Sequence, residues 1–543
     1  MWAIRGRVVT FDHDHRVIDD GVVYIGGDGR IAAVAHAADP PPTGFEGVKR
    51  VAAGGDILPG LIDLHNHLPY NTIGLWIEDQ HPEPYTDHIQ WTTQAHGPSY
   101  HDKVSGPGQF LGWVSGPSLM AYVEMKAMLG GTTTIQGNGK VNHAVEGSLA
   151  RNIDTENFGT TKDFFRGTTL VKSKDEELDE YRTAMRDKGA GFIYHVAEGT
   201  DPKLWKEFDL VDGKNPPHPD EPSTSLVGPG FVAIHGAALD EKRLKRMGQG
   251  KATLVWSPFS NMWLYGRTAD IATAKAEDIR ICLGSDWAPS GTKHVLGELK
   301  VASLWNEHPA AWSGKGPADG PVFSDQELCD MVTANPGDTI SEVSAAVLAK
   351  ANLPVPAGQV GRLEPGWFAD LIVVRKGNPD PYTNLVAATE ADVQLVVVGG
   401  EPRLGTTALM KKVGAAPNTE VRVGSLKRSV VLRNPANGDP MTWPAVLDRL
   451  AAVRANPDKA AKELALALAS AGGIDAAAAP FIVIGDMPLG DSLELGVAGR
   501  NDPPKPIAIP AFDSLRHDAA FLARVKEHTY HHGLLDGLEK FYG

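Results

Sequence analysis

Apolar runs of four to six residues alternate with helical segments between residues 57 and 350. This alternation predicts βα units around a parallel sheet, closed as a barrel or open as a doubly wound sheet. In one unit, Leu178, Tyr181 and Met185 repeat at helical spacing before the strand FIYHV. His195 therefore sits at the C-terminal end of a predicted strand.

Strands of another kind lie on both sides of this region. VVYI (22–25) and IAAV (31–34) flank a glycine-rich hairpin loop, and alternating strands return in LIVVRKG (371–377) and VQLVVVGGEP (393–402). A β unit split between two distant parts of the chain is predicted. Beyond about residue 410 follow an alanine-rich helical stretch and a proline-rich tail.

The amino-acid composition limits which partners are expected and which atoms can bind a metal. The net charge is 52 − 67 = −15, so neither a nucleic acid nor an anionic membrane is an expected partner. Only two cysteines occur, Cys282 and Cys329, and neither is in a CxxC pair, so any metal must be held by nitrogen and oxygen. No leader-like start and no run of 18 apolar residues is present, which predicts a soluble, cytoplasmic protein.

Five residues suited to metal binding or proton transfer follow apolar runs: His65, His67, His195, His235 and Asp286. Residues two apart on a strand point to the same side, so His65 and His67 can aim at one point. Taken alone, each of these residues has a simpler interpretation, since a single buried histidine is often a core residue. The spacing of His65 and His67 also recurs in His13-Asp14-His15, whose charged surroundings indicate a surface turn. Together, at successive strand ends, they predict a metal site.

Eight segments carry a family resemblance: PGLIDLHNH (59–67), GGTTTI (130–135), HVAE (195–198), IHG (234–236), SPFSN (257–261), GSD (284–286), TANP (333–336) and GRLEPGWFADLIVV (361–374). In this order they resemble the amidohydrolase superfamily over roughly residues 1–405. The resemblance implies an α/β fold, a (β/α)8 TIM barrel with a composite β-sandwich. The C-terminal helical extension predicted from the alanine-rich pattern lies outside the resemblance. The expected domains are 1–56 and 353–408 for the sandwich, 57–352 for the barrel and 409–543 for the extension, whose role is unknown.

The resemblance also implies a ligand set. His65, His67, His195 and Asp286 would hold one Zn²⁺ per chain, or Fe²⁺ or another divalent metal, with Glu198, His235 and Asp286 as catalytic residues. Glu198, three residues after His195, is typical of the mononuclear deaminase and triazine hydrolase subgroup. The alternative is a binuclear amidase or peptidase-like enzyme with a carboxylated Lys172.

The expected function is hydrolysis of a non-peptide C–N bond in a small cyclic nitrogen compound by metal-activated water. Trp91 and Asn261 are expected to contact that small-molecule substrate. A non-catalytic scaffold is the alternative of another class, and it would be expected to lack some ligands. The extension offers apolar surface at Leu464, Leu466 and Leu468. This surface predicts a homodimer or higher homo-oligomer interface, or alternatively a cover over the barrel mouth.

Overall fold

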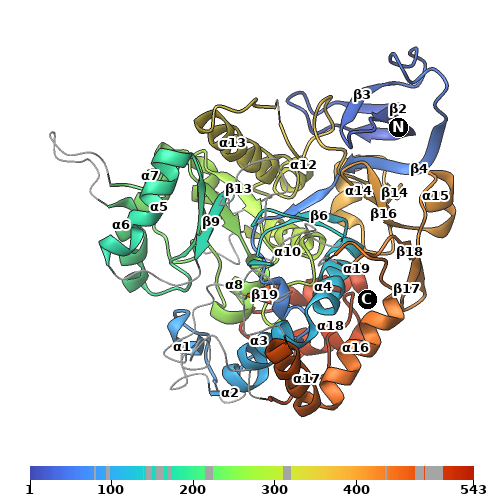
Figure 1. Cartoon of the computed structure of the whole chain (residues 1–543). Coiled ribbons are helices and arrows are strands. Elements are labelled where there is room, and N and C mark those ends of the chain that lie inside the picture. Colours follow the sequence, from blue (N-terminus) through green and yellow to red (C-terminus); the bar gives the residue numbers. More distant parts are fainter. Residues whose placement is uncertain are drawn as a thin grey trace.

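The structure is a computed structural model in which a barrel and a large β-sheet lie side by side (Figure 1). None of the helices in the described part of the chain has both the length and the apolar character needed to cross a membrane. The structure describes residues 1–78, 81–92, 98–137, 140–141, 149–154, 164–168, 174–213, 224–309, 320–356, 358–434, 437–470, 482–483 and 506–543.

Parallel strands form the barrel, and the α/β barrel predicted from the sequence is confirmed. Two hydrogen-bonded groups run in the orders β5-β6-β8 and β9-β10-β11-β12-β13. A parallel bridge between Asn66 and Asp286 joins the segments that directly follow β5 and β13. The strands are β5 (Leu61–Asp63), β6 (Thr132–Ile135), β8 (Arg151–Asn152), β9 (Phe165–Thr168), β10 (Gly191–Val196), β11 (Phe231–His235), β12 (Thr253–Trp256) and β13 (Arg280–Leu283).

Helices follow the strands and cover the outside of the barrel (Figure 1). The side chain of Asp240 accepts a hydrogen bond from the Arg243 amide and so begins α7, as Ser324 does through Glu327 for α12. The helices between and after the strands are α4 (Pro117–Leu129), α5 (Asp179–Thr183), α6 (Trp205–Asp212), α7 (Glu241–Gly250), α8 (Pro258–Tyr265), α9 (Ile271–Ala276), α10 (Val295–Glu307), α12 (Asp325–Asp330) and α13 (Ala334–Lys350).

Strand alternation decides which residues enter the barrel. Phe192 of β10 stacks on Tyr181 of α5, with ring centroids 4.3 Å apart, so it faces the helices. Ile193 belongs instead to an inner cluster of apolar residues from β11, β12 and β13. Apolar residues of α13 also belong to this cluster. Because His195 lies two residues after Ile193, its imidazole also points inward.

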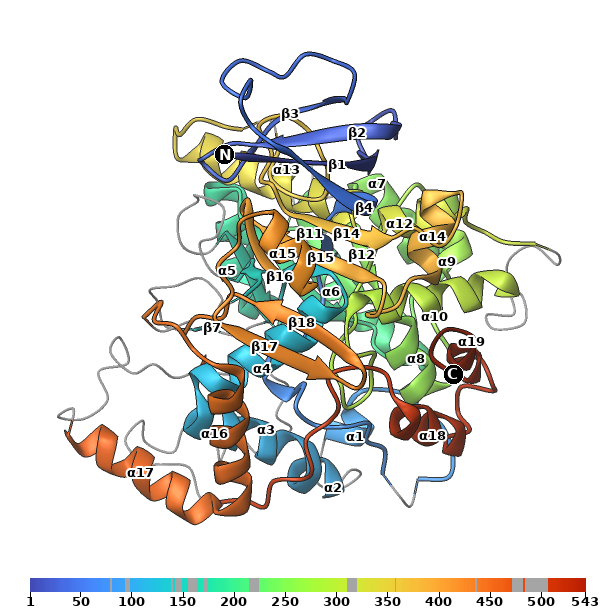
Figure 2. The ribbon, with the colours of Figure 1, turned by 90° about the vertical axis from the view of Figure 1, so that its right-hand side faces the viewer.

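Strands from distant parts of the chain make one nine-stranded sheet, so the predicted split β unit is confirmed (Figure 2). β4 pairs in parallel with β1 and antiparallel with β14, which joins the two parts. The sheet order is β17 (Thr419–Val423), β18 (Leu426–Val430), β16 (Glu401–Gly405), β15 (Val393–Val398), β14 (Leu371–Arg375), β4 (Arg50–Pro59), β1 (Trp2–Val9), β2 (Val17–Ile25) and β3 (Ile31–His36). Since β17 and β18 come after residue 408, the sheet continues into the region predicted as an extension.

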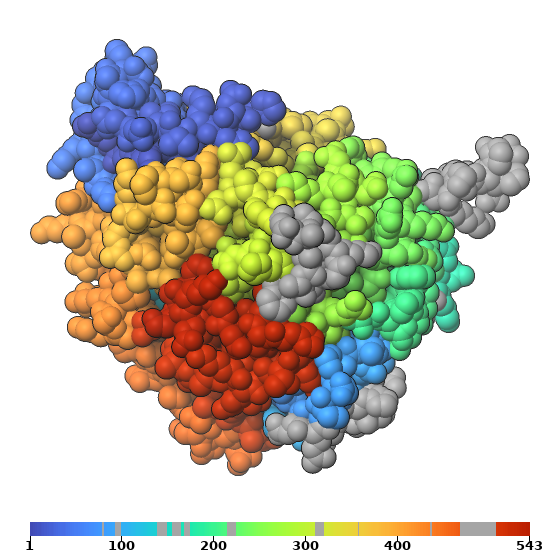
Figure 3. Space-filling model, turned by 180° about the vertical axis from the view of Figure 1, so that it is seen from behind, coloured from blue at the N-terminus to red at the C-terminus, as the bar shows by residue number. Residues whose placement is uncertain are grey.

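Residues 506–543 form a C-terminal segment that lies on the barrel (Figure 3). The segment, red in that view, meets the yellow-green surface around α10. Tyr530 donates a hydrogen bond to the carbonyl of His81, and His528 donates to that of Trp263, at 2.7 Å. His81 lies in the loop that follows β5, and Trp263 lies in α8, which follows β12. The helices after the sheet are α16 (Trp443–Ala455), α17 (Pro457–Ser470), α18 (Ala519–Glu527) and α19 (Glu539–Tyr542).

A buried ion triad holds this segment. Asp513 lies 2.9 Å from Lys126 Nζ and 2.8 Å from Lys293 Nζ, and both lysines are buried. The Asp513 amide also donates to the Thr72 carbonyl at 2.8 Å. The segment is thereby fastened to the loop that follows the first barrel strand.

We expect Asp513→Asn to lower the free energy of unfolding by about 3–5 kcal/mol, because two buried ammonium groups lose their counter-charge. Urea unfolding measures the change. Glu307→Gln is the control, since the Lys540–Glu307 pair is exposed and is expected to contribute less than about 1 kcal/mol. Equal effects of the two substitutions would contradict this prediction.

Candidate metal centre and active site

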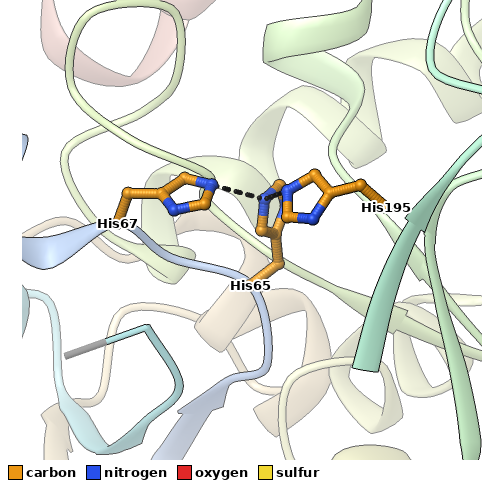
Figure 4. A group of neighbouring side chains, drawn as sticks. All are labelled: His65, His67 and His195. Atoms are coloured by element: carbon orange, nitrogen blue, oxygen red, sulfur yellow. Dashed lines mark hydrogen bonds between the residues drawn. The ribbon is translucent and has the colours of Figure 1, made fainter. Parts of the chain in front are cut away.

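Three histidines meet at the C-terminal end of the barrel strands (Figure 4). His65 and His67 follow β5, and His195 belongs to β10. His65 Nε2 lies 3.3 Å from His67 Nε2 and 3.1 Å from His195 Nε2. Asp286 Oδ1 lies 3.2 Å from His65 Nε2 and 3.5 Å from His67 Nε2. The structure thus brings together all four residues predicted as ligands.

The spacing of these atoms fits one metal ion. Two ligand atoms about 2.0–2.1 Å from a tetrahedral Zn²⁺ lie about 3.3–3.4 Å apart, which is close to the separations observed. Three imidazole nitrogens and one carboxylate oxygen are donors that Zn²⁺ accepts. The donor set and its geometry therefore match the metal that the sequence predicts.

The protonation of the histidines suits this role. Burial lowers the pKa of His67 to about 4 and holds the pKa values of His65 and His195 well below the usual value, so all three are neutral. His65 Nδ1 lies 2.8 Å from Ser257 Oγ, and donation to that oxygen leaves the Nε2 lone pair free for a metal.

Asp63, absent from the predicted set, supports the ligands from behind. Its carboxylate accepts hydrogen bonds from the Ser285 hydroxyl, from Asn66 Nδ2 at 3.0 Å and from the His65 amide at 3.3 Å. It therefore ties the end of β5 to the segment that carries Asp286. The signal in the sequence was its place in the motif PGLIDLHNH, two residues before His65.

Unusual backbone conformations aim two of the site residues. Ile234 faces the inner cluster, so regular alternation would point His235 toward the helices. His235 instead has φ 64°, and Asp286 has φ 62°, both in the left-handed region that L residues rarely adopt. The ring of His235 consequently lies 4.8 Å from that of His65. Such local strain is typical of functional sites.

A chain of hydrogen bonds defines the tautomer of His235. The indole of Trp256, which can only donate, binds Thr268 Oγ1 at 2.6 Å, so the Thr268 hydroxyl donates to Asn261 Oδ1 at 3.3 Å. Asn261 Nδ2 then donates to His235 Nδ1 at 3.1 Å. His235 therefore carries its proton on Nε2. The structure places Asn261 behind His235, and its contact with a substrate stays a prediction.

Glu198 lies beside this group, with Oε1 3.8 Å from His235 Nε2. Burial raises the pKa of Glu198 to about 7, and the hydrogen bond from the Tyr265 hydroxyl at 2.6 Å opposes that rise. A carboxyl group with a pKa near neutrality can both hold and release a proton. The residue predicted as the proton carrier thus has a suitable environment.

Aromatic side chains surround the approach to the metal site. Trp287 lies edge-on to His67, with ring centroids 5.7 Å apart, and Trp91 lies 5.9 Å from Trp287. Tyr70 and Tyr100 pack on the same indole at 5.4 and 6.1 Å. Contact of Trp91 with a substrate stays a prediction.

A second cluster joins His294, Glu390 and His517. His294 Nδ1 accepts a hydrogen bond from the Gly297 amide at 3.1 Å, so the proton of this imidazole is on Nε2 and is donated to Glu390 at 2.9 Å. No lone pair of His294 therefore faces the cluster. This arrangement ties the C-terminal segment to α10 and does not suit a metal. Lys172, the alternative bridging residue, lies outside the described residues.

Comparison with known proteins finds relatives that are similar in sequence along most of the chain. No family model matches the sequence. A 5-methylthioadenosine/S-adenosylhomocysteine deaminase from Syntrophobacter fumaroxidans is 26% identical over 441 residues, covering 74% of this chain and 92% of that protein. Relatives with the same or similar names occur among the other matches, including a 5'-deoxyadenosine deaminase from Methanopyrus kandleri.

Solved structures show the same fold. Atrazine chlorohydrolase from Arthrobacter aurescens, complexed with zinc, superposes with a TM-score of 0.53 at 17% identity, covering 83% of this chain and all of that chain. An adenosine deaminase from Xanthomonas campestris with bound zinc superposes with the same TM-score and identity, covering 76% of this chain and 97% of that chain. The chain is therefore similar in sequence to deaminases of 5'-modified adenosines, and it shares its fold with zinc-bound atrazine chlorohydrolase and adenosine deaminase.

Proposed function

We propose that the protein is a hydrolytic deaminase of adenine nucleosides that uses one divalent metal ion, with Zn²⁺ as the first candidate. The observation that carries the proposal is the meeting of His65, His67, His195 and Asp286 beside a buried carboxyl group. The relatives named as 5'-modified adenosine deaminases support a substrate that carries a 6-amino group on a purine.

Different residues of the site have different roles in this reaction. A Zn²⁺ ion held by these ligands would lower the pKa of a coordinated water to about 7 and so supply a nucleophile at neutral pH. Asp286 would accept the proton that this water loses and return it to the departing amino group. His235, protonated on Nε2, donates a hydrogen bond to the oxygen that adds to the ring carbon. Glu198 delivers a proton to the ring nitrogen and so helps the amine to leave as ammonia.

A substrate panel tests the proposal. Purified, zinc-loaded protein is incubated with adenosine, 5'-methylthioadenosine, S-adenosylhomocysteine and 5'-deoxyadenosine, and with atrazine and a simple cyclic amide. Ammonia is expected from at least one adenine nucleoside, in equal amount to the purine converted. Turnover of only the triazine or the amide would overturn the choice of substrate.

Metal counting separates the mononuclear site from the binuclear alternative. We expect one metal equivalent per chain in active protein, measured by elemental analysis, and reconstitution with Fe²⁺ compares the two metals. Two equivalents, with a carboxylated Lys172 seen by mass spectrometry, would replace this proposal with the binuclear amidase. A cytoplasmic homodimer is also part of the proposal, and light scattering of the purified protein tests the oligomer.

A further inference from the structure

Tyr265 is a fully enclosed residue that connects two parts of the active site. It is the last residue of α8 and is 2% exposed. Its hydroxyl lies 2.6 Å from Glu198 Oε1 and 3.0 Å from Trp91 Nε1. Glu198 comes from the end of β10, and Trp91 from α1 (Ile89–Thr92) in the loop after β5. Side chains from segments that follow three different barrel strands thus meet at one phenol oxygen.

The direction of these hydrogen bonds follows from chemistry. An indole N–H can only donate, so the Tyr265 oxygen accepts from Trp91. The single proton of the phenol is then directed to Glu198 Oε1. Oε1 thus accepts the phenol proton. A proton carried by Glu198 is therefore favoured on Oε2, because a proton on Oε1 would have to displace that of the phenol.

We propose that Tyr265, oriented by Trp91, is a positioning residue that holds Glu198 by Oε1 and keeps its transferable proton on Oε2. This inference rests on the proposed role of Glu198 as proton carrier. Without the phenol, the carboxyl group can rotate and present either oxygen, so only part of the protonated enzyme is ready to react.

The backbone around Glu198 supports the same arrangement. The His88 amide donates to the Glu198 carbonyl at 3.2 Å, and the Thr200 amide donates to the Thr86 carbonyl at 2.8 Å. The loop that carries Trp91 is therefore fastened to the loop that carries Glu198. Trp91 also packs against Trp287 near the metal ligands. A ligand that displaces the Trp91 ring would release the proton of Tyr265 from its fixed direction.

A double-mutant cycle tests the inference, with 5'-methylthioadenosine as substrate. Tyr265→Phe removes one hydroxyl and is expected to lower kcat about 10- to 100-fold, the value of a hydrogen bond to a charged group, while KM changes little and the metal content is unchanged. In a Glu198→Gln background the same substitution is expected to cause no further loss, because Tyr265 acts through Glu198. Tyr24→Phe, in another fully buried tyrosine within the nine-stranded sheet, is the control.

The outcomes separate this inference from the function on which it rests. Losses that multiply in the double variant would overturn the role of Tyr265 and leave that of Glu198 intact. A Glu198→Gln enzyme with full kcat, or a wild-type enzyme that turns over no adenine nucleoside, would overturn the proposed function and the inference with it. A Tyr265→Phe enzyme that loses metal would show that the tyrosine supports the metal site instead.

Discussion

Replacing His65 with alanine is expected to abolish turnover and strip the metal from the protein. The substitution removes one of four side chains whose ligand atoms lie 3.1–3.5 Å from one another in the measured pairs. Without a bound ion, the pKa of water returns to its much higher bulk value and hydroxide is scarce at neutral pH, so kcat/KM is expected to fall by more than about 1,000-fold. Steady-state kinetics and elemental analysis of the same preparation measure both losses.

The chain contains a matched control for this experiment. His13 belongs to a second His-x-His pair, but it is exposed and its neighbour His15 pairs with Asp330 at 2.9 Å. His13→Ala is expected to retain full activity and full metal content. A His65→Ala protein with wild-type zinc and turnover would show that the metal binds elsewhere.

Glu198→Gln is expected to lower kcat by about 100- to 10,000-fold, the usual contribution of general acid–base catalysis, with the metal retained. Glutamine keeps the size of the side chain and can still accept the hydrogen bond from Tyr265. It has no acidic proton to transfer, and its amide group cannot take one up at neutral pH. The kinetics are measured at saturating substrate, where kcat reports the bound enzyme.

Glu207 provides the comparison. It is also buried, its pKa is also raised to about 7 by burial, and its carboxylate accepts the Ala197 amide at 2.8 Å. Glu207→Gln keeps that acceptor and is expected to leave kcat within about threefold of wild type, as for a substitution that preserves a structural hydrogen bond. If Glu198→Gln loses metal, Glu198 belongs among the ligands; if it keeps its kcat, another group moves the proton.

The site was predictable where strand periodicity controls it. His65, His67, His195 and Asp286 each end an apolar run, and the C-terminal ends of parallel strands meet in a barrel. The supporting residues were not predictable in this way. Tyr265 binds Glu198 from 67 residues away in the chain, and nothing in its local sequence distinguishes it from a core tyrosine. Such contacts depend on how whole βα units pack together.

In the fold, too, the features with a periodic sequence pattern were predictable, and contacts between distant elements were not. The split β unit was visible because its strands alternate regularly around glycine-rich turns. The place of the C-terminal segment was not, because Asp513, Lys126 and Lys293 are charged residues that a sequence pattern assigns to the surface. The two lysines are buried because the carboxylate of Asp513, which is partly covered, pairs with both of them. Burial of charge in pairs leaves no periodic signal along the chain.

The pairing of β4 with β14 has a consequence for synthesis of the protein. Pro59 pairs with Leu371, 371 − 59 = 312 residues later in the chain. At about 5–20 residues per second, the ribosome needs roughly 15–60 s to deliver the second strand. Throughout that interval the edge of β4 that will bind β14 is without its partner. We therefore expect the nascent chain to depend on chaperones until β14, among the orange strands of Figure 2, has emerged. Cold slows translation and lengthens this interval, so expression in the cold is expected to favour soluble protein only when chaperones are abundant.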